Sequence, residues 1–284
     1  MSATLDPQAK VDRAHEHIDA LERLVAVFSR DAYSVDVQPA FWVEPLPPGS
    51  GDVILWAEAT REPPAVLWGP IIGDIVHGLR SALDQLVWGL SVEFQATLGV
   101  TPPPDPIVRG SPWRMIWFPV CLRPVAWDTG VVPQQLWAID PTLLTVLKEL
   151  QPFRTGKNTP DREPLAVLQE LWNIDKHRHL HLVNATVELH DVLYVQPFPG
   201  LPEIEYEVLS KRAPGPIVGK TEIGRASFIR RPGGLVGTNA PQVGMNPRVA
   251  IDVTFDQGAP AHGGRVLHTL REIAQTVQAI IAAC

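Results

Sequence analysis

Two short polar clusters lie within otherwise apolar helical stretches, and they hold the residues best suited to chemistry. The first runs from His77 to Gln85 and contains Arg80 and Asp84. An arginine held by a carboxylate one helical turn away can grip a phosphate or a carboxylate through two hydrogen bonds. A histidine one turn before it can move a proton near neutral pH. The cluster predicts an anion site in which His77, Arg80 and Asp84 carry the catalytic roles.

The same spacing allows two structural interpretations of this cluster. Residues 77, 80, 81, 84 and 88 fall on one helical face, opposite a stripe of leucines and isoleucines. Such a face is commonly solvated and crossed by one ion pair. Alternatively, Arg80 and Asp84 form a buried pair that joins helices in a structural or interaction protein, and removing either partner would then cost roughly 3–5 kcal/mol.

The second cluster is a basic segment in which Asn173, Lys176, His177 and Arg178 lie within six positions. Asn173 and His177 are four residues apart, so they share a face if the helix extends that far. We expect His177 to join the catalytic set, and Asn173, Lys176 and Arg178 to bind the anion. The structural alternative is that these basic residues stabilise the carboxyl end of a helix, where positive charge favours the helix dipole.

Three alternating histidines, His177, His179 and His181, raise the separate hypothesis of a metal-dependent hydrolase. In an extended chain all three would point the same way and could bind zinc. In a helix only His177 and His181 would pair. We favour the helix-capping interpretation, because metal sites usually show more ligands, and we predict no metal and no cofactor.

Both clusters resemble segments of known proteins. Residues 78–84 and 173–178 are similar to a group of uncharacterised bacterial proteins that carry the same two segments. The first segment also resembles the signature of HEPN domains, in which an arginine is followed four to six residues later by a histidine. These domains are helical bundles, often dimeric, and many cleave RNA without a metal.

The resemblance as a whole covers about residues 70–181, and its HEPN part, which rests on the short pattern at Arg80, implies a function. It implies that the protein binds RNA or a nucleotide phosphate, that Arg80 stabilises charge on the scissile phosphate, and that the chain forms a homodimer. Gln85 stands where the HEPN histidine is expected, and glutamine cannot exchange a proton near neutral pH. The implied protein is therefore an inactive or altered ribonuclease.

Composition limits the function classes further. The chain has 284 residues and a net charge of -7, which argues against non-specific binding to nucleic acid because such binding depends on excess Lys and Arg. Its two cysteines give neither a disulfide framework nor a metal spacing. No signal peptide is visible and no apolar run approaches the roughly 20 residues of a membrane span, so we expect a cytoplasmic protein without membrane partners.

Hydrophobic periodicity predicts the elements that position the clusters. Apolar stripes at helical spacing predict about five helices within residues 7–31, 69–98, 134–176 and 264–283. Alternating patterns predict an inserted β-hairpin at 33–61 and a larger antiparallel segment at 182–256. We therefore predict an α+β fold, a single domain over residues 1–284 with a helical bundle as its core.

One stretch fits neither pattern. Many of the 29 prolines lie between residues 102 and 133, which predicts an extended loop over 100–133. This loop also contains Trp113, Trp117 and Trp127. They are expected either to cover the bundle or to form a lid or stacking surface.

Overall fold

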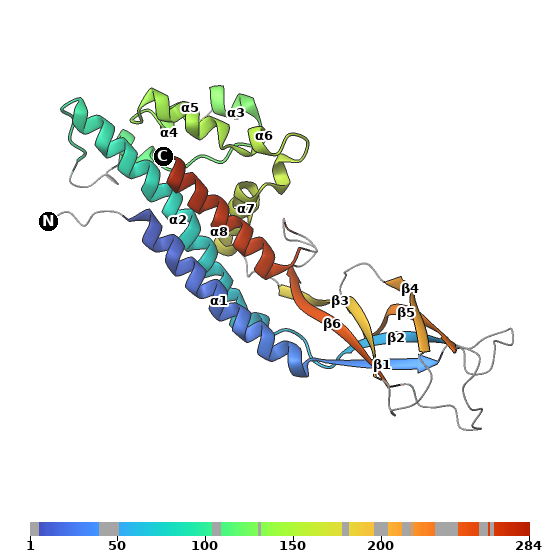
Figure 1. Ribbon diagram of the computed structural model, residues 1–284. Coiled ribbons are helices and arrows are strands. Elements are labelled where there is room, and N and C mark those ends of the chain that lie inside the picture. The colour runs from blue at the N-terminus through green and yellow to red at the C-terminus, as the bar shows by residue number, and fades with distance from the viewer. Residues whose placement is uncertain are drawn as a thin grey trace. The chain divides into compact units, whose positions relative to one another are not determined.

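The computed structural model has the α+β fold that the sequence predicts. It describes residues 6–39, 51–103, 109–129, 132–177, 182–195, 204–211, 217, 219–230, 244–255, 261 and 264–284. The chain divides into two compact units (Figure 1). Unit 1 comprises residues 1–23, 64–182 and 255–284, and unit 2 comprises residues 24–63 and 183–254.

Unit 1 is built on long helices that run side by side. They are the first part of α1 (Pro7–Asp31), α2 (Ala65–Thr97), α7 (Pro164–His177) and α8 (Val266–Ala283). Helices α2, α7 and α8 pack against one another in pairs. Each contributes apolar side chains at helical spacing, and the expected stripe on α8 is buried throughout: Val266, Leu270, Ile273, Val277 and Ile280. This bundle forms the rigid support of the candidate site.

Helix α2 is the longest described helix, and it begins earlier than expected. The sequence predicts a start at residue 69, which would put Pro70 in the first helical turn, where proline is favoured. The helix instead begins at Ala65, and Pro70 lies inside it. The apolar stripe explains this tolerance, because Ile72, Ile75, Leu79 and Leu83 are all buried and hold the helix in place.

The proline-rich region is only partly the extended loop that its prolines predict. It contains η1 (Pro112–Met115), α3 (Pro124–Thr129) and the start of α4 (Val132–Gln135), and α5 (Pro141–Glu149) follows within the range 134–176 that was expected to be helical. Proline is the first residue of η1, α3 and α5, and also of α6 (Pro152–Thr155), η2 (Pro160–Arg162) and α7. Because its fixed φ suits the first helical position, proline starts short helices here and does not exclude them.

The short helices gather together at one end of unit 1 (Figure 1). Trp113 in η1 fixes this group to α2, since its ring meets the ring of Trp88 edge-on at 5.4 Å. The Trp113 ring also meets that of Trp137 edge-on, at 5.5 Å. Such edge-to-face pairs add to the energy of burial. They hold the chain that follows η1 against the face of α2 that carries Arg80.

Unit 2 contains the β structure. Strands β1 (Tyr33–Pro39) and β2 (Gly51–Ala59) form the expected antiparallel hairpin, with Tyr33 opposite Ala59. They belong to a four-stranded sheet in the order β1-β2-β5-β4, where β4 is Ile204–Lys211 and β5 is Lys220–Arg230. Strands β3 (Leu182–Val195) and β6 (Gly244–Phe255) pair in a second sheet. The segments predicted to be β insertions thus lie almost wholly in unit 2.

Candidate functional site

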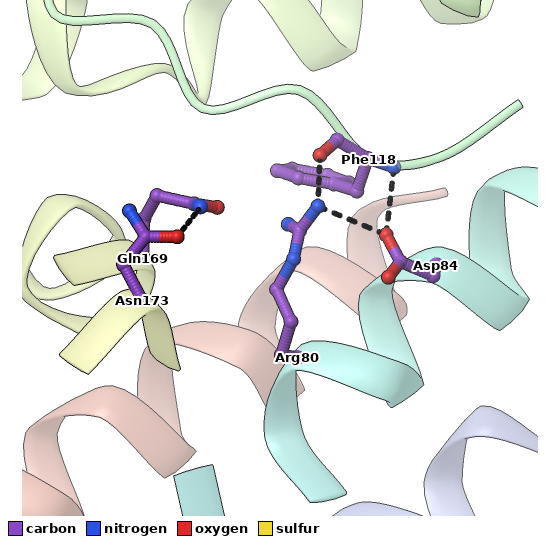
Figure 2. A network of polar contacts seen from close by, with 5 residues as sticks. All are labelled: Arg80, Asp84, Phe118, Gln169 and Asn173. Carbon is purple, nitrogen blue, oxygen red and sulfur yellow. Dashed lines mark hydrogen bonds and ion pairs between the residues drawn. The ribbon is translucent and has the colours of Figure 1, made fainter. Parts of the chain in front are cut away.

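Arg80 is not the solvated residue that its helical face suggested, because the chain around Phe118 covers it. Its side chain lies on α2 and the residue is 3% exposed. Figure 2 shows its Nη2 donating to the carbonyl oxygen of Phe118 at 2.7 Å and pairing with Oδ1 of Asp84 at 3.0 Å. The same Oδ1 accepts a hydrogen bond from the backbone N–H of Phe118 at 2.9 Å. The pair therefore satisfies both backbone polar groups of one residue.

The guanidinium of Arg80 is only partly satisfied by these contacts. Its Nε and Nη1 atoms are buried and have no hydrogen-bond acceptor among the described residues. A buried donor without an acceptor costs roughly 1–3 kcal/mol, and more when the group is charged. An additional hydrogen-bond acceptor at Nε or Nη1 would therefore stabilise the buried guanidinium.

Helix α7 supplies the other wall around Arg80. The guanidinium carbon lies 5.3 Å from the ring centroid of Trp172, and Nζ of Lys176 lies 3.0 Å from a ring centroid of the same indole. Both are cation–π distances. One turn before Asn173, Gln169 donates to the Asn173 Oδ1 at 3.2 Å, and Figure 2 shows its carboxamide turned toward Arg80. Residues of the two predicted clusters thus meet around one indole.

A glycine allows α7 to approach α2 closely. A Cβ atom added to Gly73 would lie 2.5 Å from Oδ1 of Asp175, closer than real Cβ contacts. Gly73 lies about two helical turns before Arg80 on α2. Its missing side chain therefore helps to set the distance between Arg80 and Trp172.

A cavity of about 650 Å³ lies beside the guanidinium. Its lining comes from five parts of unit 1: Arg80 and Asp84 of α2, the segment 117–121, Ala126 of α3, Val132 and Gln135 of α4, and Gln169 and Trp172 of α7. The volume falls within the range of roughly 300–1,000 Å³ that is typical of small-molecule sites. Most of the wall is apolar, and a few polar groups converge on it, as is usual for such sites.

Burial dominates the ionisation of the groups in this wall. It raises the pKa of the Asp84 carboxyl above its ordinary value, against the opposing effects of Arg80, the Phe118 N–H, Lys176 and His77. Burial also lowers the pKa of Arg80, while Asp84 acts to raise it; an arginine nevertheless stays protonated at neutral pH. The thiol of Cys121 has its pKa raised by burial, so it is a poor nucleophile at neutral pH.

The predicted site residues are only partly brought together. Arg80 and Asp84 line the cavity, and Lys176 and Asn173 lie on α7 beside it. His77 is exposed; its charge acts on Asp84, but it is not part of the cavity wall. His177 is the last residue of α7, and nothing further is described for its side chain. Arg178, His179 and His181 fall outside the described residues.

Several residues of the cavity carry no clear signal in the sequence. Of the tryptophans in the proline-rich region, Trp113 and Trp127 are buried, whereas Trp117 lines the cavity. Gln135 and Gln169 also line it. The four-residue spacing of Gln169 and Asn173 was the only available signal for Gln169, and Gln135 had none.

Comparisons with known proteins add no assignment: no protein-family model, no curated protein and no solved structure matches this chain. The resemblance of the Arg80 segment to the HEPN signature therefore stays a prediction. Within the described residues, no cluster of three or more His, Cys, Asp or Glu side chains is arranged to hold a metal ion. No helix in that part of the chain combines the length and apolarity needed to cross a bilayer.

Proposed function

We propose that this protein binds a nucleotide, either free or as part of RNA, in the cavity beside Arg80. The observation that carries the proposal is a buried guanidinium with two unpartnered nitrogen atoms in the wall of a cavity of about 650 Å³. A ligand oxygen brought to this group would supply the missing acceptor. The proposal agrees with the HEPN-like placement of Arg80 on a helix of a bundle.

The remaining walls suit the other parts of a nucleotide. Trp117 lines the cavity and is only half-buried, so its indole is open to contact with a flat ring. Stacking of a base on an aromatic side chain is worth about 1–3 kcal/mol. Lys176 is exposed next to the cavity wall and supplies positive charge for a phosphate. The cavity and the Trp117 indole fit a base, and Lys176 fits the anion linked to it.

We propose binding, and not histidine-assisted RNA cleavage, as the activity of this wall. Cleavage without a metal needs groups that exchange protons near neutral pH. Gln85 stands at the position of the HEPN histidine, and no histidine belongs to the described cavity wall. We therefore propose an altered HEPN-like protein that has kept a nucleotide site.

The direct test is to block the cavity from its rim. Ala126 is exposed on α3 yet lines the cavity, so Ala126→Trp should fill the opening without disturbing the core. Its neighbour Val125 is 60% exposed and is not part of the lining, so Val125→Trp is the matched control. Calorimetric titration should use each ribonucleoside 5′-monophosphate and a short single-stranded RNA.

We expect wild type and Val125→Trp to bind at least one of these ligands with equal affinity, and Ala126→Trp to bind at least tenfold more weakly, a difference of about 1.4 kcal/mol. A preference for the oligonucleotide over the mononucleotide would identify RNA as the source of the nucleotide. Absence of binding by the wild type, or equal binding by both variants, would refute the proposed site.

A second candidate function follows from the depth of the network. Arg80 is 3% exposed and ties α2 to the chain at Phe118, as expected of a structural or interaction protein whose polar cluster joins helices. This candidate predicts that Arg80 contributes to stability and that the cavity holds no ligand. Ala126→Trp then has no binding to weaken. The titration above therefore separates the two.

A further inference from the structure

The charges around Arg80 determine which part of a nucleotide faces it. Arg80 already has a carboxylate partner, since Asp84 Oδ1 lies 3.0 Å from its Nη2. The pair as a whole carries no net charge. A phosphate placed at the guanidinium would lie within a few ångströms of the Asp84 carboxylate, and at this depth water screens the repulsion only weakly. The pair is thus better matched to an uncharged group.

The pair, which lies in the cavity wall, also contains both kinds of hydrogen-bonding group. Arg80 carries the unpartnered donors. Asp84 has a side chain that is 32% exposed, and both hydrogen-bonding contacts described for it use Oδ1. Within the described residues its Oδ2 is therefore the acceptor left for a ligand. A ring that places an acceptor next to an N–H donor matches this arrangement, and every nucleobase carries such an edge.

A different cation is available for the phosphate. Lys176 is exposed, and its ammonium lies 3.0 Å from a ring centroid of Trp172, one wall of the cavity. No ion pair with an acidic side chain is described for it among the residues of the structure. An exposed ammonium accepts an anion at a smaller desolvation cost than a buried guanidinium.

On the basis of the proposed function, we infer that the cavity holds the base of the nucleotide against Arg80 and Asp84, and that the phosphate stays outside it on Lys176. The site thus recognises the nucleoside part, and the phosphate adds a modest surface interaction. This assignment reverses the usual expectation for an arginine in a nucleotide site, where the guanidinium contacts the phosphate.

The experiment compares three sets of probes with the full-length protein. They are the four ribonucleosides, their 5′-monophosphates, and inorganic phosphate alone. The proteins are wild type, Lys176→Gln and the control Lys148→Gln, which changes a lysine paired with Asp128 away from the cavity. We expect at least one nucleoside to bind, its monophosphate to bind about twofold to fivefold tighter, and inorganic phosphate not to compete.

Lys176→Gln should reduce the affinity for the monophosphate to that for the nucleoside and leave nucleoside binding unchanged, whereas Lys148→Gln should change neither. If the nucleosides fail to bind while inorganic phosphate competes with the monophosphate, Arg80 contacts the phosphate, so the inference is wrong and the proposed function stands. If Lys176→Gln leaves monophosphate affinity unchanged, the assignment of Lys176 is wrong. If neither nucleosides nor monophosphates bind, the proposed function itself fails.

Discussion

At the scale of single residues, the stability of the site depends on keeping Arg80 and Asp84 together. Replacing Arg80 by methionine fills similar space but leaves a largely buried carboxylate without its cation. Because the Asp84 side chain is 32% exposed, water compensates part of the loss, and we expect Arg80→Met to lower the free energy of unfolding by about 2–4 kcal/mol. Urea denaturation of wild type and variant measures this difference.

The double variant Arg80→Met/Asp84→Asn is the matched control for this effect. Asparagine can still accept the Phe118 N–H, and it carries no charge. We expect the double variant to be at least about 1 kcal/mol more stable than Arg80→Met alone. If the losses of Arg80→Met and of Asp84→Asn, each measured alone, simply add in the double variant, the two side chains are not coupled, and the network does not exist as described.

Tyr33 in unit 2 gives a residue-scale prediction for pH. Burial raises its pKa from 10.0 to about 12, against the lowering effect of Arg61. The unfolded chain therefore releases this proton at a lower pH than the folded protein does. The contribution of Tyr33 to stability is complete below pH 10 and is lost as the pH rises toward 12.

The measurement compares the free energy of unfolding of wild type with that of Tyr33→Phe across this range. Other groups that titrate at high pH affect both proteins equally. We expect the stability of wild type relative to Tyr33→Phe to decrease between pH 10 and pH 12. A difference that stays constant over this interval would contradict the burial of the phenol.

At the scale of elements, two glycines of α2 test the packing of α7. Alanine normally stabilises a helix interior relative to glycine by about 1 kcal/mol. Gly89 has nothing within 4 Å of its added Cβ, so Gly89→Ala should gain this amount. Gly73→Ala should gain nothing or lose stability, because its Cβ would lie 2.5 Å from Oδ1 of Asp175.

Thermal or urea denaturation of both variants provides the comparison. In an Asp175→Ala background the contact is gone, and Gly73→Ala should then stabilise the protein as much as Gly89→Ala does. Equal gains for the two glycine variants in the wild-type background would show that α7 does not approach α2 as closely as described.

The elements also show what the sequence can and cannot predict. The stripe on α8 and the buried positions of α2 follow from local periodicity, which one sequence contains in full. The helices of the proline-rich region do not follow from local periodicity, because proline both breaks helices and starts them. Contacts between residues distant in the sequence, such as that of Trp113 with Trp88, accompany the helices that form there. The i, i+4 spacing likewise predicts the Arg80–Asp84 pair. Its burial depends on Phe118, which is more than thirty residues away.

At the scale of the whole molecule, the net charge of -7 limits how nucleic acid can bind. An acidic protein with one lysine placed for a phosphate should release about one counterion per ligand. For single-stranded RNA we therefore expect the logarithm of the affinity to fall with the logarithm of salt concentration with a slope of about -0.7.

Titrations of the short RNA at several salt concentrations measure this slope. A slope of about -3 or steeper would mean that several phosphates contact basic residues at once. The ligand would then lie along an extended basic surface and not within the cavity. If the slope is near zero, so that the affinity for the RNA does not change with salt concentration, the RNA makes no phosphate contact at Lys176.

Occupation of the cavity beside Arg80 by a nucleotide can be followed directly through the indole N–H resonances in NMR spectra. Trp117 lines the cavity, whereas Trp137 lies outside the lining and is 39% exposed. Each resonance can be assigned by a single Trp→Phe substitution. On titration with a ribonucleoside 5′-monophosphate, we expect a saturable shift of the Trp117 resonance and an unchanged Trp137 resonance. A Trp117 resonance that does not move, or a Trp137 resonance that moves as far, would contradict nucleotide binding in the cavity.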